Sequence, residues 1–130
     1  MSDDPLLALL DIDDADVAAR WQRLDAWMQR RFGRPAGLEA TLFLIGLQTH
    51  GTGFQPDLEK DRKQSLIMEG TYCAFETLGL YERVGMNEDG FWIWARTRPL
   101  PELDVEAQEK LLRLAILRYF EVQNLLPASP

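Results

Sequence analysis

The chain has 130 residues, of which 46% are hydrophobic and 27% charged, so it has the composition of an ordinary globular protein with room for one domain. Its net charge of −7 repels polyanions. The single cysteine, Cys73, excludes an internal disulfide and suits a reducing compartment. The longest apolar run, residues 42–45, is far shorter than the ~20 residues that span a membrane. We therefore expect an acidic, cytoplasmic protein.

Charge is unevenly distributed along the chain. Residues 1–19 carry six aspartates and no basic residue, whereas residues 20–34 carry five arginines against a single acid, Asp25. We expect these two segments to attract each other within the molecule and to form a partly neutralised, solvated face. Nucleic-acid binding by the arginine segment is disfavoured at this net charge, so neither a nucleic acid nor a membrane is a predicted partner.

Two helices are predicted in the N-terminal third. A short one runs from Pro5 to about Leu10, with proline at its first position. A long one begins at Asp13 or Asp14, either of which can cap it, and ends at Gly33 and Pro35. Its apolar residues recur at spacings of four, three and four, which marks one helical face: Val17, Trp21, Leu24 and Met28.

A third helix is predicted over Leu38–His50 and a fourth over about residues 58–78. The third is apolar on every side, as expected of a helix surrounded by protein, and Gly46 within it would let another helix approach closely. The fourth ends at Gly79, whose left-handed conformation would place Phe75 and Leu80 in the positions of a Schellman motif.

After Gly79 the spacing of the apolar residues changes from that of a helix to that of a strand. Apolar residues alternate over residues 91–97, and the sequence Asn-Glu-Asp-Gly at 87–90 is typical of a type I turn. We predict a hairpin of residues 81–85 against 91–97, in which Trp92 and Trp94 lie on the face opposite Phe91, Ile93 and Ala95. Only one of these faces can cover the hairpin's own helices.

A last helix is predicted from its cap, Asp104, to about Val122. The fold is therefore mainly α, with four main helices, a short N-terminal helix and one β-hairpin. The alternative is an α+β fold in which residues 99–103 add a third strand to a small antiparallel sheet. We predict one domain over residues 1–130: an N-terminal arm (1–12), a helical core (13–122) that includes the hairpin at about 81–97, and a tail (123–130).

The stretch "LIGLQTHGTGF" holds the only histidine, His50. Zinc and di-iron signatures that need two histidines are impossible within one chain. Phosphate binding is disfavoured because the glycines lack a following Lys-Ser/Thr and come after the negative end of a helix dipole. A structural role explains the stretch better, since an imidazolium in the last helical turn is stabilised by that dipole. No metal, cofactor or catalytic residue is predicted.

Two segments carry a resemblance to a known family: "LFLIGLQTHGTGF" and "EDGFWIWARTRPLPELDVEAQEKLLRLAILRYFE", with "EKDRKQSLIMEG" between them. Over roughly residues 38–121 the chain resembles a family of small uncharacterised bacterial proteins of unknown function. The resemblance implies one compact bacterial domain, and it assigns no activity or catalytic residue.

The function most consistent with these patterns is that of a non-enzymatic protein-interaction or adaptor domain that self-associates. We predict a homodimer with Trp92 or Trp94 at or near the contact, because large apolar side chains on an uncovered face mark interfaces. In a competing arrangement, the leucines of residues 6–10 cover that face in a monomer. The alternative function is small-molecule binding or catalysis in a pocket near His50, Thr52, Trp92 and Trp94.

Overall fold

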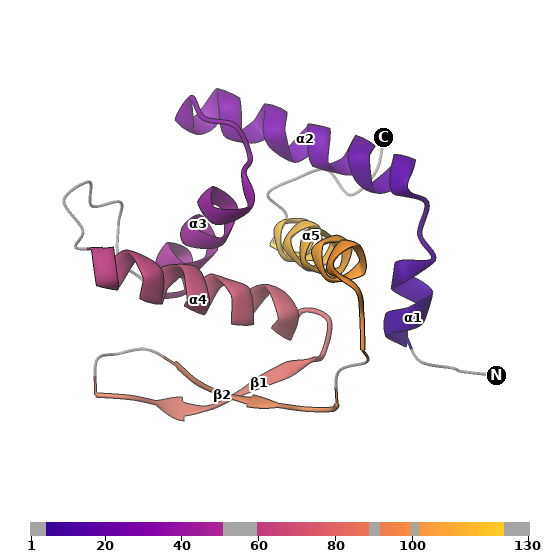
Figure 1. The fold of residues 1–130 in the computed structure, drawn as a ribbon. Coiled ribbons are helices and arrows are strands. Elements are labelled where there is room, and N and C mark those ends of the chain that lie inside the picture. Colours follow the sequence, from indigo (N-terminus) through magenta and orange to yellow (C-terminus); the bar gives the residue numbers. More distant parts are fainter. Residues whose placement is uncertain (1–4, 51–59, 89–91, 100–101, 124–130) are drawn as a thin grey trace. The chain divides into compact units, whose positions relative to one another are not determined.

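The computed structural model describes residues 5–50, 60–88, 92–99 and 102–123. In chain order its elements are α1 (Pro5–Leu10), α2 (Asp14–Phe32), α3 (Leu38–His50), α4 (Lys60–Glu76), β1 (Tyr81–Met86), β2 (Trp92–Arg96) and α5 (Val105–Val122) (Figure 1). Helices make up 68% of the structure and the two strands form an antiparallel hairpin, so the predicted mainly α fold is confirmed. Residues 99, 102 and 103 belong to no strand, and residues 100 and 101 lie outside the described part.

The chain groups into two compact units. Unit 1 comprises residues 1–36 and 101–130, and therefore holds α1, α2 and α5; unit 2 comprises residues 37–100, with α3, α4 and the hairpin. Residues within a unit lie close together, which does not show that either unit folds alone. The single domain therefore stays a prediction.

In unit 1, α2 starts and ends as its sequence predicts. The Asp13 carboxylate accepts a hydrogen bond from the Ala15 N–H at 3.0 Å, and Gly33 ends the helix with a φ of 68°. The apolar face is buried at Val17, Leu24 and Met28. Trp21, on the same face, is half-buried, and its indole N–H donates to the Ala36 carbonyl at 3.0 Å.

The α5 helix packs on both α2 and α1. Asp104 caps it by accepting from the Ala107 N–H at 2.8 Å, as predicted. The Phe120 ring lies edge-on to Trp27 of α2 with centroids 5.5 Å apart, and Arg20 forms a 2.6 Å ion pair with Glu121. Seven of the eighteen α5 residues are buried: Leu111, Leu114, Ala115, Ile116, Leu117, Tyr119 and Phe120.

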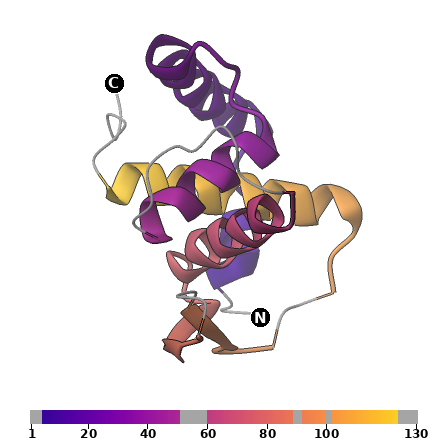
Figure 2. The ribbon, with the colours of Figure 1, turned by 90° about the vertical axis from the view of Figure 1, so that its left-hand side faces the viewer.

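In unit 2, α3 lies against α4, as both ribbon views show (Figures 1 and 2). The two helices cross at Gly46 and Gly70, where the backbone of each helix touches the other. The close approach predicted for Gly46 is therefore confirmed. Burial of α3 is less complete than predicted, because Glu39 and Gln48 are exposed.

The end of α4 forms the predicted Schellman motif. Gly79 has a φ of 77°, its N–H donates to the Glu76 carbonyl at 2.9 Å, and the Leu80 N–H donates to the Phe75 carbonyl at 3.2 Å. These two bonds satisfy carbonyls that the helix itself leaves free. Residues 58 and 59, at the start of the predicted fourth helix, lie outside the described residues.

The hairpin that follows lies along one side of α4 (Figure 1). Its register pairs Arg83 with Trp94 and Met86 with Trp92, and a bulge interrupts β1 between Arg83 and Gly85. Each end of the two strands lies within one residue of its predicted position. Asp89 and Gly90 of the predicted turn lie outside the described residues.

Candidate functional site

The candidate ligand-binding residues near the histidine are described only in part. His50 is the last residue of α3, as predicted, but its side chain and all of Thr52 lie outside the described residues. Its neighbour Thr49 is half-buried, and the Thr49 hydroxyl is 3.2 Å from the Cys73 thiol of α4. This end of α3 is therefore attached to α4 by a polar contact.

The Cys73 thiol beside it lies in surroundings that oppose its ionisation. The side chain is buried, and this burial raises the pKa of Cys73 to about 11, an effect that the hydrogen bond with Thr49 only partly opposes. Since the thiolate is the reactive form, these surroundings favour a structural role for Cys73.

The two hairpin tryptophans face their own helix, not solvent. Trp94 stacks on Tyr72 of α4 with ring centroids 5.7 Å apart and planes 16° apart. The Arg83 guanidinium lies over both indoles, 4.9 Å from the Trp92 centroid and 5.3 Å from that of Trp94, and it also pairs with Glu76 at 2.9 Å. The Arg83 guanidinium therefore contacts both indole rings and the Glu76 carboxylate within unit 2.

This arrangement corrects the prediction of which hairpin face is left uncovered. Trp92 and Trp94 are half-buried, whereas the opposite side carries Ile93 with 46% of its surface exposed. Val84, at the bulge of β1, is 56% exposed. The large apolar side chains that the described hairpin residues leave in solvent are therefore Val84, Met86 and Ile93, of which Met86 lies opposite Trp92.

A buried carboxylate covers part of the free edge of β2. The Thr97 N–H donates to the Leu80 carbonyl, on the β1 side, so the amide of Trp92 points away from β1 because strand amides alternate in direction. Glu69 of α4, only 4% exposed, accepts this amide at 3.3 Å. Nearby, the indole N–H of Trp94 is buried and has no hydrogen-bond partner within the described part of the chain.

A groove lies in unit 1, between α5 and the α1–α2 segment, and encloses about 630 Å³. From α2 it is lined by Val17, Ala18, Trp21 and Gln22, and four carboxylates also line it: Asp14, Asp104, Glu106 and Glu109. No sequence pattern predicted this groove. Its described lining residues all belong to unit 1.

Both cations in the groove already have partners. The Lys110 ammonium donates to the Leu10 carbonyl at 2.8 Å and also to the Ile12 carbonyl, and it lies 2.9 Å from the Asp14 carboxylate. The Arg113 guanidinium stacks 4.6 Å from the Trp21 ring. These contacts join α1 and α2 to α5.

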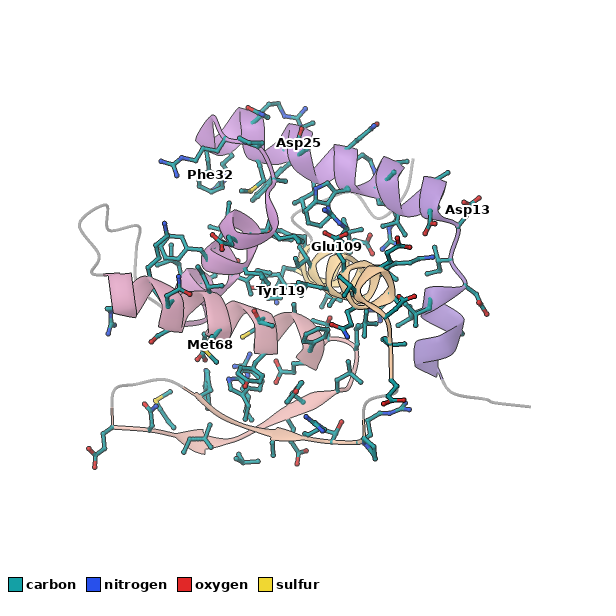
Figure 3. The ribbon with its side chains drawn as sticks, viewed as in Figure 1. Asp13, Asp25, Phe32, Met68, Glu109 and Tyr119 are labelled. Carbon is teal, nitrogen blue, oxygen red and sulfur yellow. The ribbon has the colours of Figure 1, made fainter. Side chains whose placement is uncertain are left out.

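The outward face of α2 is a second surface of unit 1 that adjoins the groove at Gln22, and its charge changes sign along the helix. Asp13 and Phe32, labelled in Figure 3, mark its two ends. Asp16 near the first end and Arg30 and Arg34 near the second are exposed, and no ion pair joins them to any described residue. Between them the face presents small or uncharged exposed side chains: Ala15, Ala19, Gln22, Ala26 and Gln29.

None of the ion pairs between described residues joins the acidic segment to the arginines, and Asp3 and Asp4 lie outside the described residues. Arg20 pairs with Glu121, and Asp14 pairs with Lys110, so both partners come from α5. The reason is geometric: Asp16 and Arg30 lie on one continuous helix, where fourteen residues span about 21 Å. Such a helix cannot fold back to bring its own ends together.

Comparison with profiles of known protein families, with curated protein sequences and with solved structures finds no match to this chain. The resemblance to small bacterial proteins therefore remains an expectation. Within the described residues, no group of three or more His, Cys, Asp or Glu side chains could hold a metal ion. None of the described helices is both long and apolar enough to cross a bilayer.

Proposed function

We propose that the protein is a cytoplasmic, non-enzymatic protein-interaction domain that self-associates through the outward face of α2. The observation that carries the proposal is the charge pattern of that face. An acidic end and an arginine end are both exposed, and Asp16, Arg30 and Arg34 have no ion-pair partner among the described residues. Complementary charge between protein surfaces promotes encounter and selects partners.

Two further observations support an interaction role over ligand binding. The hairpin aromatics that could line a small-molecule pocket are engaged with Tyr72, Arg83 and Glu76 instead. The groove of unit 1 has both of its cations engaged in contacts that hold α1, α2 and α5 together. We therefore propose a homodimer contact on α2 in place of the one predicted at Trp92 and Trp94.

Sedimentation velocity and light scattering across protein concentration test the proposal. We expect a dimer at about 50 mM salt that dissociates as salt rises to about 500 mM, because screening weakens contacts between exposed charges. Ile93→Glu, on the aliphatic side of the hairpin, is the matched control and should leave the dimer unchanged. A monodisperse monomer at high concentration in low salt would overturn the proposal.

A further inference from the structure

The outward face of α2 has the geometry of a helix–helix contact. Its residues 15, 19, 22, 26 and 29 follow one another at spacings of four, three, four and three, so they form one stripe along the helix. The stripe lies opposite the buried residues Val17, Leu24 and Met28. Three of its five residues are alanines, whose small side chains allow a second helix to come close.

The charges at the two ends of this stripe determine which helix fits. Asp11 and Asp16 are exposed at the acidic end, and Arg30 and Arg34 are exposed at the other. A two-fold axis brings residue i of one copy to residue j of the other and j to i. A helix that is acidic at one end and basic at the other is therefore complementary to its own copy, provided the two run antiparallel.

On this basis we infer that two copies of the chain pair their α2 helices antiparallel across a two-fold axis near Gln22. The acidic end of each helix then meets the arginine end of the other. The inference rests on the proposed self-association through α2, and it adds the direction in which the two helices run. A parallel pair would place aspartates beside aspartates and arginines beside arginines, and exposed like charges repel.

The size of the contact sets the expected strength. The nineteen residues of α2 span about 28 Å, and alanines bury little surface, so the contact is smaller than the ~800 Å² per partner of a typical stable complex. The dimer should therefore be weak, rapidly exchanging and sensitive to salt. This is the behaviour of a regulated or concentration-dependent association.

Charge reversal tests the pairing. Asp11→Lys/Asp16→Lys places two lysines at the acidic end, and Arg30→Glu/Arg34→Glu places two glutamates at the arginine end. Neither change touches the Asp13 cap or the Asp14–Lys110 pair. Each double variant alone should bind its own copy at least about tenfold more weakly. An equimolar mixture of the two should form a heterodimer, because every end again meets an opposite charge.

The matched control for net charge is Arg96→Glu/Arg118→Glu, which changes the charge by the same amount as Arg30→Glu/Arg34→Glu at exposed residues of β2 and α5. It should leave self-association unchanged at the same salt concentration. Far-UV circular dichroism of every variant verifies that the helices are retained. If the two α2 variants do not dimerise when mixed although each remains folded, the inference is overturned.

Engineered cysteines test the antiparallel direction. In a Cys73→Ala background, Gln22→Cys lies near the axis and should oxidise to a disulfide-linked dimer, which requires Cα atoms within about 7 Å. Ala15→Cys lies seven residues from the axis, so its copy would be about 21 Å away and should not link to it. Mixing Ala15→Cys with Gln29→Cys should restore the link.

The outcomes separate this inference from the proposed function. Efficient linking of Ala15→Cys to its own copy would indicate a parallel pair and overturn the antiparallel arrangement while leaving self-association in place. No linking at any α2 position in a protein that still dimerises would place the contact elsewhere. A protein that never dimerises overturns both.

Discussion

A Cβ atom added to Gly46 would lie 1.9 Å from the carbonyl oxygen of Leu66, so α3 and α4 touch through their backbones. The reciprocal contact is as tight: a Cβ on Gly70 would lie 1.8 Å from the Leu42 carbonyl oxygen. Both distances are far below any van der Waals contact, and backbone atoms cannot rotate away as a long side chain can. The crossing of these helices therefore depends on glycine at both positions.

We predict that Gly46→Ala and Gly70→Ala each destabilise unit 2. Alanine favours a helix by about 1 kcal/mol relative to glycine, but the two packed backbones must separate to admit its Cβ atom. We expect the free energy of unfolding to fall by about 1–3 kcal/mol net. Gly37→Ala, where an added Cβ meets nothing within 4 Å, is the control and should be nearly neutral. Chemical denaturation measures all three. Unchanged stability of the Gly46 variant would show that the helices can separate without cost.

A second prediction concerns the end of α4. Gly79 has a φ of 77° and open space around its α-carbon, so only backbone strain penalises a larger residue there. Gly79→Val should lower the free energy of unfolding by about 1–2 kcal/mol more than Gly79→Asn, since asparagine tolerates the left-handed region and β-branched residues do not. Equal stability of the two variants would mean that the Schellman motif can be replaced by another ending.

The helices were predictable because their signals are local. Asp13 and Asp104 cap helices within three residues of themselves, and the spacing of Val17, Leu24 and Met28 places them on one face whatever lies against it. The Schellman motif at Gly79 likewise consists of bonds that span three and five positions. Such signals need no knowledge of the rest of the fold.

The hairpin orientation and the groove were not predictable for the opposite reason. Alternation shows that Trp92 and Ile93 lie on different faces, but both faces are apolar, so it does not show which one α4 covers. The groove depends on Lys110 reaching the carbonyl of Leu10, a hundred positions away in the chain. No spacing rule connects residues at that distance.

That lysine is the subject of a third prediction. Lys110→Met removes the donor to the Leu10 and Ile12 carbonyls, and it keeps a side chain of similar length. We expect a loss of about 1–3 kcal/mol, mostly from the carbonyl bonds, because the Asp14 side chain of the ion pair is 89% exposed and adds little.

Hydrogen exchange locates the effect of this change. Amides of α1 should exchange faster in Lys110→Met, while those of α3 and α4, in the other unit, keep their protection. Arg118→Met is the control, since Arg118 is exposed on the same helix. If α1 exchange is the same in all three proteins, Lys110 does not fasten the N-terminal segment.

The last prediction follows from the buried thiol of Cys73. Burial raises its pKa from 9.0 to about 11 in the folded protein, against a partly opposing hydrogen bond with Thr49. The unfolded chain therefore ionises this thiol first, and ionisation favours the unfolded state. The corresponding stability is fully present below pH 9 and is lost as the pH rises from 9 toward 11. Two pKa units correspond to roughly 2–3 kcal/mol.

Unfolding measured between pH 8 and pH 11 in wild type and Cys73→Ala tests this. Alanine cannot ionise, so the difference in stability between the two proteins should shrink across that range, whatever the fixed cost of the smaller side chain. The native thiol should also resist a thiol reagent at pH 8 and react once the protein is unfolded, because the Cys73 side chain is only 1% exposed. Rapid modification of the folded protein, or a pH-independent difference, would contradict a buried neutral thiol.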